Sequence, residues 1–149
     1  MQHVAVVAGR ATGNYYAPVY SRLLVFRRGA NVELPPATPF TPAPLNPPPS
    51  VASAEQIARG RTLYDANCVL CHDDPGNAGG IFLRGLFPDL AYSPTLPSAE
   101  AFAAIVIGGA RAANGMASYS GVLDAEGADS IRVFLIKEAN DARPPNAPR

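Results

Sequence analysis

The residues best suited to chemistry lie in one pentapeptide, residues 68–72 of the 149-residue chain. Cys68 and Cys71 are separated by two residues, and His72 follows the second thiol directly. This spacing is the signature of covalent haem attachment, because each thiol can add across one vinyl group while the next residue ligates the iron from one face. We therefore expect thioethers from Cys68 and Cys71 and a proximal iron ligand from His72.

The same pentapeptide has three alternative interpretations. A zinc ribbon needs a second pair of ligands, whereas the chain has no further cysteine and only one other histidine, His3. A thioredoxin-like thiol pair follows a buried strand, whereas both flanks here have helical patterns. A structural disulfide or a chance match is the third alternative. Residues later in the chain favour haem over all three.

Met116 is the expected second axial ligand, since the only other methionine is Met1. Single methionines most often fill a core. Here the haem motif and an irregular loop of small residues favour ligation instead. A thioether opposite an imidazole stabilises ferrous iron, and two filled axial positions leave no open site for a small ligand. This combination favours electron transfer.

The pentapeptide and Met116 lie between three predicted helices, each preceded by a side chain that can cap its first turn. The helices cover residues 54–67 after Ser53, residues from Ser98 to the glycines at 108–109, and residues 125–140 after Asp124. Gly60 lies inside the first of them, where it costs ~1 kcal/mol relative to alanine. A close helix contact at Gly60 is therefore expected.

The N-terminal third has a different pattern. Residues 4–8 and 22–26 are short apolar runs that predict two strands. Residues 34–50 contain eight prolines and no charged side chain, which is typical of an extended linker. The resulting division is two strands within residues 1–33, a Pro-rich linker over 34–51, a helical domain over 52–140 and a disordered tail over 141–149.

Charge and hydropathy exclude some functions. The 12 basic and 12 acidic residues cancel, so no net field favours nucleic acid. No apolar run reaches the roughly 18 residues of a membrane span.

The first ten residues lack the basic and long apolar parts of a signal peptide. Because haem c is attached outside the cytoplasm, we expect a periplasmic location and a chain that begins partway through a longer secreted protein.

Several residues match landmarks of a known family. They are Pro88 and Leu90 of a Pro-X-Leu element, Gly60 and Tyr64 of a Gly-X-X-X-aromatic pattern, and Phe134 of the last helix. With these residues the chain resembles a class I cytochrome c domain, an all-α fold of three to four helices around haem c.

This resemblance implies further roles. The Pro88 carbonyl would accept the proton of His72 Nδ1, and Leu90 would pack on the proximal haem face, so both would bind the cofactor. Backbone approach at Gly60 would let the first and last helices cross closely.

A narrower resemblance covers nearly the whole chain. Residues 21–29 and 34–36 are similar to the end of the β-propeller in quinohaemoprotein alcohol dehydrogenases, where a proline-rich linker joins a pyrroloquinoline quinone (PQQ) propeller to a C-terminal cytochrome c domain. The resemblance implies electron transfer from reduced PQQ to a soluble blue-copper protein or another cytochrome. Two positions depart from this family's usual pattern: Asp73, where a glycine is common, and Ala91, where an arginine is common. The quinone pocket and its catalytic acid are not in this chain, so the expected domain has no catalytic site of its own.

Electron transfer through haem c is therefore the function that the sequence favours, with PQQ confined to the presumed parent enzyme. One alternative is a haem sensor or enzyme in which Met116 dissociates and a small ligand binds the iron. A second alternative is a non-functional gene fragment.

Overall fold

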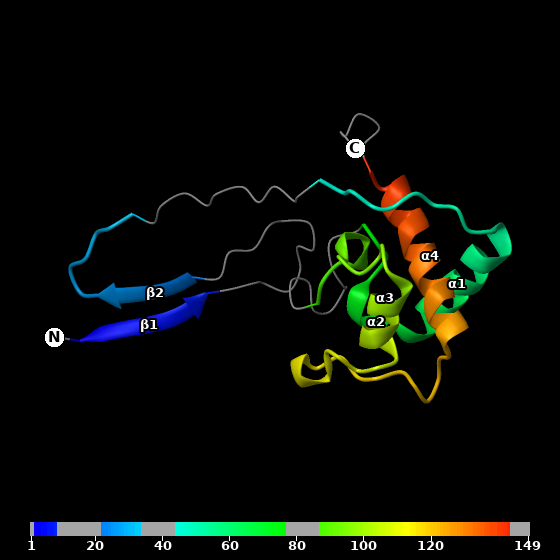
Figure 1. Cartoon of the computed structure of the whole chain (residues 1–149). Helices are drawn as coiled ribbons and strands as arrows, with labels where there is room; N and C mark the ends of the chain where they lie inside the picture. Colours follow the sequence, from blue (N-terminus) through cyan, green and yellow to red (C-terminus); the bar gives the residue numbers. More distant parts are fainter. Residues whose placement is uncertain (1, 9–21, 34–43, 77–86, 144–149) are drawn as a thin grey trace. The chain divides into compact units, whose positions relative to one another are not determined.

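The computed structural model describes residues 2–8, 22–33, 44–76 and 87–143 (Figure 1). The chain divides into two compact units, Met1–Ala43 and Pro44–Arg149. The first part of the predicted linker and most of the predicted tail, residues 34–43 and 144–149, lie outside the described residues.

The first unit contains an antiparallel hairpin of β1 (His3–Ala8) and β2 (Arg22–Arg27). The two predicted strands are thus present. Val6 pairs with Leu24 and Val7 with Leu23, so successive pairs place apolar side chains on opposite faces of the ribbon. Val7 is 77% exposed on one face and Val6 is 45% exposed on the other. Within the described residues, both faces of this hairpin therefore present apolar surface.

The second unit is helical, and the three predicted helices are confirmed. Its elements are α1 (Ala54–Asn67), α2 (Val69–His72), the 3₁₀ turn η1 (Leu90–Tyr92), α3 (Ala99–Val106), the 3₁₀ turn η2 (Ala112–Asn114) and α4 (Ala125–Asp141). The side chains of Ser53, Ser98 and Asp124 accept hydrogen bonds from first-turn amides of α1, α3 and α4, as expected of N-caps. None of the helices in the described ranges combines the length and hydropathy that a bilayer crossing requires.

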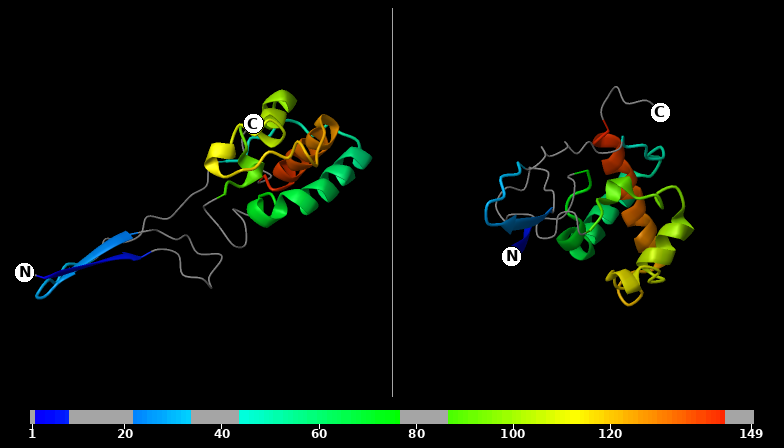
Figure 2. Two further views of the ribbon diagram at one scale, coloured as in Figure 1. Left: turned by 90° about the horizontal axis from the view of Figure 1, so that it is seen from below. Right: turned by 90° about the vertical axis from the view of Figure 1, so that its left-hand side faces the viewer.

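The close contact between α1 and α4 centres on Gly60. A Cβ added at Gly60 would lie 1.9 Å from the carbonyl oxygen of Ser130 and 2.8 Å from the Cβ of Phe134. One turn further along α1, the fully buried Tyr64 ring packs at 5.4 Å between centroids against Phe134. The predicted close crossing is confirmed, and Figure 2 shows the two helices lying against each other. The core is built around this crossing.

Residues 44–51 differ from their prediction. The sequence placed them in one linker with residues 34–43, whereas the structure groups them with the helices. Leu45 is buried against Ala91 and Ala139, and the Asn140 side-chain amide donates to the Pro48 carbonyl at 2.9 Å. Prolines lose amide donors but keep their carbonyl acceptors, so a proline-rich segment can still be held along a helix.

We expect Gly60→Ala to lower the free energy of unfolding by about 1–3 kcal/mol or more, because the added methyl forces α1 and α4 apart. At an open helical site, the same change would instead raise the free energy of unfolding by about 1 kcal/mol. Gly121→Ala is the control, since a Cβ there meets nothing within 4 Å. Chemical denaturation of both variants checks the sign, and a stabilised Gly60→Ala protein would contradict the close crossing.

Candidate functional site

The pentapeptide begins where α1 ends. The Cys68 amide donates to the Tyr64 carbonyl at 2.8 Å, and the Cys68 carbonyl accepts from His72 N at 3.0 Å, so Cys68 ends α1 and begins α2. Cys68 and Cys71 are free thiols, each half-buried. Burial raises the pKa of the Cys68 thiol to about 12, and the neighbouring Cys71 adds to the rise. A thioredoxin-like pair needs a lowered thiol pKa, so this geometry does not favour that alternative.

The imidazole of His72 is buried and held from one side. Its Nδ1 lies 2.8 Å from the Pro88 carbonyl oxygen. A carbonyl can only accept, so Nδ1 carries the proton and Nε2 is left with its lone pair. The ring of Phe87 lies 6.0 Å from the imidazole, centroid to centroid. The structure thus contains the hydrogen bond that the resemblance implied, a contact that fixes the orientation of the ring.

Two tyrosine hydroxyls hold the backbone on either side of the pentapeptide. Tyr64 donates to the carbonyl of Asp73, just after His72, and Tyr119 donates to the carbonyl of Asn67, just before Cys68, at 3.0 Å. Burial raises the pKa of both tyrosines, so both hydroxyls stay protonated at neutral pH. Sequence reasoning assigned these hydroxyls no role. An aromatic residue in a loop of small residues, three positions after Met116, was the available signal for Tyr119.

Met116 lies in the segment between α3 and α4. Of residues 110–122, Met116 and Tyr119 are half-buried, Val122 is 70% exposed, and the rest are also exposed. Met116 N donates to the Arg111 carbonyl at 3.3 Å, which closes the turn that carries the thioether. Met116 packs against the same core cluster as Cys68.

The donor set and its surroundings fit a haem. Apolar residues from four separate segments pack against the core but remain partly exposed, as expected where a large flat apolar group completes the burial: Cys68, Val69, Leu90, Ile107, Met116 and Tyr119. The chain offers two thiols, one imidazole nitrogen and one thioether beside this cluster. Among the described residues, no group of three or more His, Cys, Asp or Glu side chains could hold a metal ion by itself.

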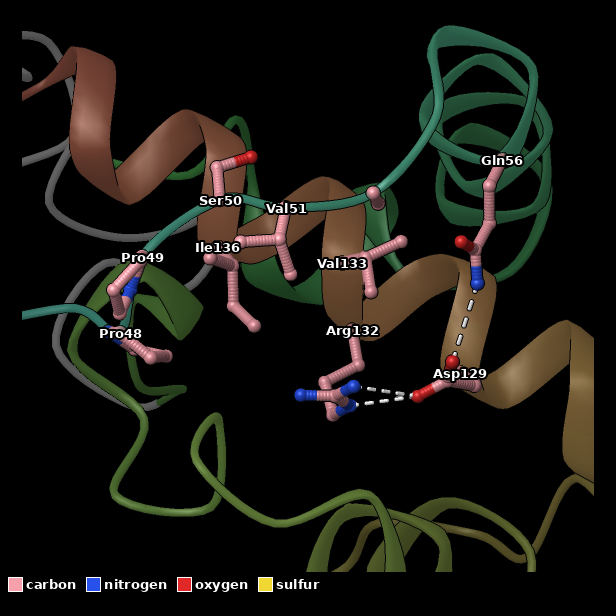
Figure 3. Close-up of a pocket in the computed structure, with 10 residues that line it drawn as sticks. Pro48, Pro49, Ser50, Val51, Gln56, Asp129, Arg132, Val133 and Ile136 are labelled. Carbon is pink, nitrogen blue, oxygen red and sulfur yellow. Dashed lines mark hydrogen bonds and ion pairs between the residues drawn. The ribbon is translucent and has the colours of Figure 1, made fainter.

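A second concave region lies away from these residues, between residues 48–52 and α4 (Figure 3). Its volume is about 280 Å³. Arg132 forms an ion pair there with Asp129 and donates to the Leu96 carbonyl, and Gln56 donates to Asp129. The charged side chains that line this groove are thus engaged with each other and with the Leu96 carbonyl.

Comparison with known proteins agrees with the geometry of the pentapeptide. Residues 55–135 match the family described as cytochrome c oxidase, cbb3-type, subunit III. The chain belongs to this family of cytochrome c domains. The match covers α1, the pentapeptide, Met116 and the first part of α4, and a cytochrome c domain implies haem.

Relatives of this cytochrome c domain are much longer proteins. The chain is 36% identical over 118 residues to a quinohemoprotein alcohol dehydrogenase, ADH IIB of Pseudomonas putida, covering 78% of the chain and 16% of the relative. It is 31% identical to the dehydrogenase subunit of a quinone alcohol dehydrogenase of Gluconobacter oxydans, covering 83% and 16%. The solved structure of quinohemoprotein alcohol dehydrogenase ADHIIG from Pseudomonas putida HK5 matches with a TM-score of 0.60 and 31% identity, covering 82% of this chain and 17% of that one.

The cytochrome domain carries a strained residue directly after His72. Asp73 has φ 57° and ψ −173°, a conformation that is almost confined to glycine. The bond from Tyr64 to the Asp73 carbonyl and the bond from Asp73 N to the Val69 carbonyl hold it there. A glycine is common at this position in the resembling family, which the backbone geometry explains.

We expect Asp73→Gly to raise the free energy of unfolding by about 1 kcal/mol, because the strain removed exceeds the chain entropy that glycine adds. Asp73→Asn is the matched comparison, since asparagine keeps the size and tolerates positive φ better than most residues. Denaturant unfolding of the three proteins measures the effect. A less stable Asp73→Gly protein would mean that the contacts of the Asp73 side chain outweigh the strain.

Proposed function

We propose that this domain transfers single electrons through a covalently bound haem c, with thioethers from Cys68 and Cys71 and axial ligation by His72 and Met116. The observation that carries the proposal is the Nδ1 hydrogen bond of His72 to Pro88, which fixes the imidazole in a pentapeptide that also carries two free thiols. When bound, the haem supplies an iron centre that cycles between ferric and ferrous states.

The residues of the chain account for the other requirements of such a carrier. The Pro88 carbonyl holds the His72 proton and fixes the imidazole. Leu90 and Val69 offer apolar surface that excludes water. A soft thioether from Met116 favours the ferrous state and closes the remaining axial position. The proposed fold is the all-α class I cytochrome c fold, with residues 52–140 as the domain and residues 34–51 as the connecting segment.

We further propose that the N-terminal hairpin belongs to a larger sheet structure. Apolar side chains on both faces of β1 and β2 require cover on both sides, and a two-stranded hairpin alone is only marginally stable in water. The relatives named quinohemoprotein alcohol dehydrogenases support a PQQ propeller domain as that cover. Electrons would then pass from reduced PQQ through this haem to a soluble blue-copper protein or cytochrome in the periplasm.

Replacing Met116 tests the axial ligation. In haem-loaded protein, Met116→Ala should abolish the thioether-to-iron charge-transfer band and lower the reduction potential, because the soft ligand that stabilises ferrous iron is lost. Val122→Ala, an exposed position in the same segment, is the control. Optical spectra and potentiometric titration provide the readout. An unchanged band in Met116→Ala would remove Met116 from the iron.

The thiols are tested by covalent retention of haem. When the chain is exported behind a signal peptide, denaturing electrophoresis should show a haem-stained band, since only covalently held haem survives denaturation. The double variant Cys68→Ser/Cys71→Ser should lose that band while the polypeptide remains visible by protein stain. A stained band that persists in the double variant would contradict the thioether assignment.

A further inference from the structure

The segment that carries Met116 is bonded to α3 near both ends, and at its entrance Ala110 N donates to the Ala104 carbonyl at 3.1 Å. Tyr119 N donates to the Val106 carbonyl at 2.8 Å, and the Tyr119 carbonyl accepts from the amides of Val122 and Leu123. The hydroxyl of Ser118 donates to the carbonyl of Ile107. These contacts tie the exit of the loop to the end of α3. The thioether lies three residues upstream of Tyr119, directly after η2, where Met116 N donates to the Arg111 carbonyl at 3.3 Å.

The Tyr119 side chain makes a different connection, to the end of α1. Its hydroxyl donates to the carbonyl of Asn67 at 3.0 Å, and 52 residues of sequence separate the two. Asn67 is the last residue of α1, where helical carbonyls have no partner further along the helix. The Tyr119 hydroxyl therefore satisfies one of these carbonyls at the residue next to Cys68.

Within residues 110–122, the side chains of Met116 and Tyr119 are the half-buried ones, and they lie three positions apart. Both pack against the core cluster on which Cys68 also packs. The loop thus directs two side chains inward, the thioether of Met116 and the phenol of Tyr119. The Tyr119 hydroxyl is bonded to the carbonyl of Asn67, the residue directly before the pentapeptide.

We propose that Tyr119 is a positioning residue for the sixth ligand: its hydroxyl locks the Met116 loop to the Asn67 carbonyl and so keeps the thioether on the iron. The inference rests on the proposed ligation by Met116. According to this inference, the rate at which the Met116 thioether leaves the iron depends on the hydrogen bond from Tyr119 to Asn67, which involves neither the iron nor its ligands. Without the hydroxyl, the loop keeps its backbone bonds to α3 but loses its bond to the end of α1.

The test is replacement of the Met116 sulfur by added imidazole in the ferric, haem-loaded protein, followed by stopped-flow absorbance. Imidazole forms a bond to iron as the thioether bond breaks, with no change of oxidation state. Tyr119→Phe removes the hydroxyl and keeps the ring. We expect imidazole to enter about two- to tenfold faster in this variant, which corresponds to the loss of one neutral hydrogen bond. Its thioether-to-iron band at rest should remain visible.

Two other Tyr→Phe substitutions test whether a faster exchange reflects the position of Tyr119 or a general loosening of the domain. Tyr92→Phe removes a partly exposed hydroxyl in η1 and should exchange at the wild-type rate. Tyr64→Phe removes a more deeply buried hydroxyl that also bonds a carbonyl beside the pentapeptide. Tyr119→Phe should speed the exchange more than Tyr64→Phe does, although Tyr64 is the more buried side chain.

A wild-type exchange rate in Tyr119→Phe would overturn the inference, as would an equal acceleration in Tyr64→Phe. Met116→Ala distinguishes this failure from failure of the proposed ligation. If Met116→Ala loses the thioether band but Tyr119→Phe exchanges normally, only the role of Tyr119 falls. If Met116→Ala keeps the band, the ligation and the inference fall together.

Discussion

The contact between α1 and α4 at Gly60 constrains everything that follows α1 in the helical unit. The backbones approach so closely that a single methyl group at Gly60 would overlap the carbonyl of Ser130. Tyr64 and Phe134 then fill the space one turn further on, and Arg61 lies over the Phe134 ring from the solvent side at 5.5 Å. Because α1 is fixed in this way, its last residue and Cys68 are fixed too. The position of the pentapeptide 68–72 therefore depends on a helix crossing as well as on its own short turn.

Much of this arrangement could be predicted from sequence because it depends on local signals. Ser53, Ser98 and Asp124 are capping residues by chemistry, and the structure uses each of them as a cap. Gly60 could be interpreted as a helix contact because a helix tolerates a glycine poorly without a packing reason. The bond between His72 and Pro88 was predictable only through a family resemblance, since sixteen residues separate the two.

The features that sequence reasoning missed depend on contacts between distant residues. Nothing local indicates that the Tyr119 hydroxyl reaches the carbonyl of Asn67. The high proline content over residues 34–50 concealed a buried leucine, Leu45, whose partners come from η1 and α4. The backbone of Asp73 is a third case, because an aspartate gives no sign that it occupies a conformation favoured by glycine. In each case tertiary contacts decide a structure that local propensity leaves open.

The attachment of residues 44–51 to α4 changes how a neighbouring module would meet this domain. A flexible connection confines its two ends to a volume set by the number of free residues, and the effective concentration of one end at the other falls as that number grows. Leu45 and Pro48 are fixed to the helical unit, so they add nothing to the free length. Any segment joined upstream of these residues is therefore anchored at Leu45, beside η1 and α4, rather than at the first turn of α1.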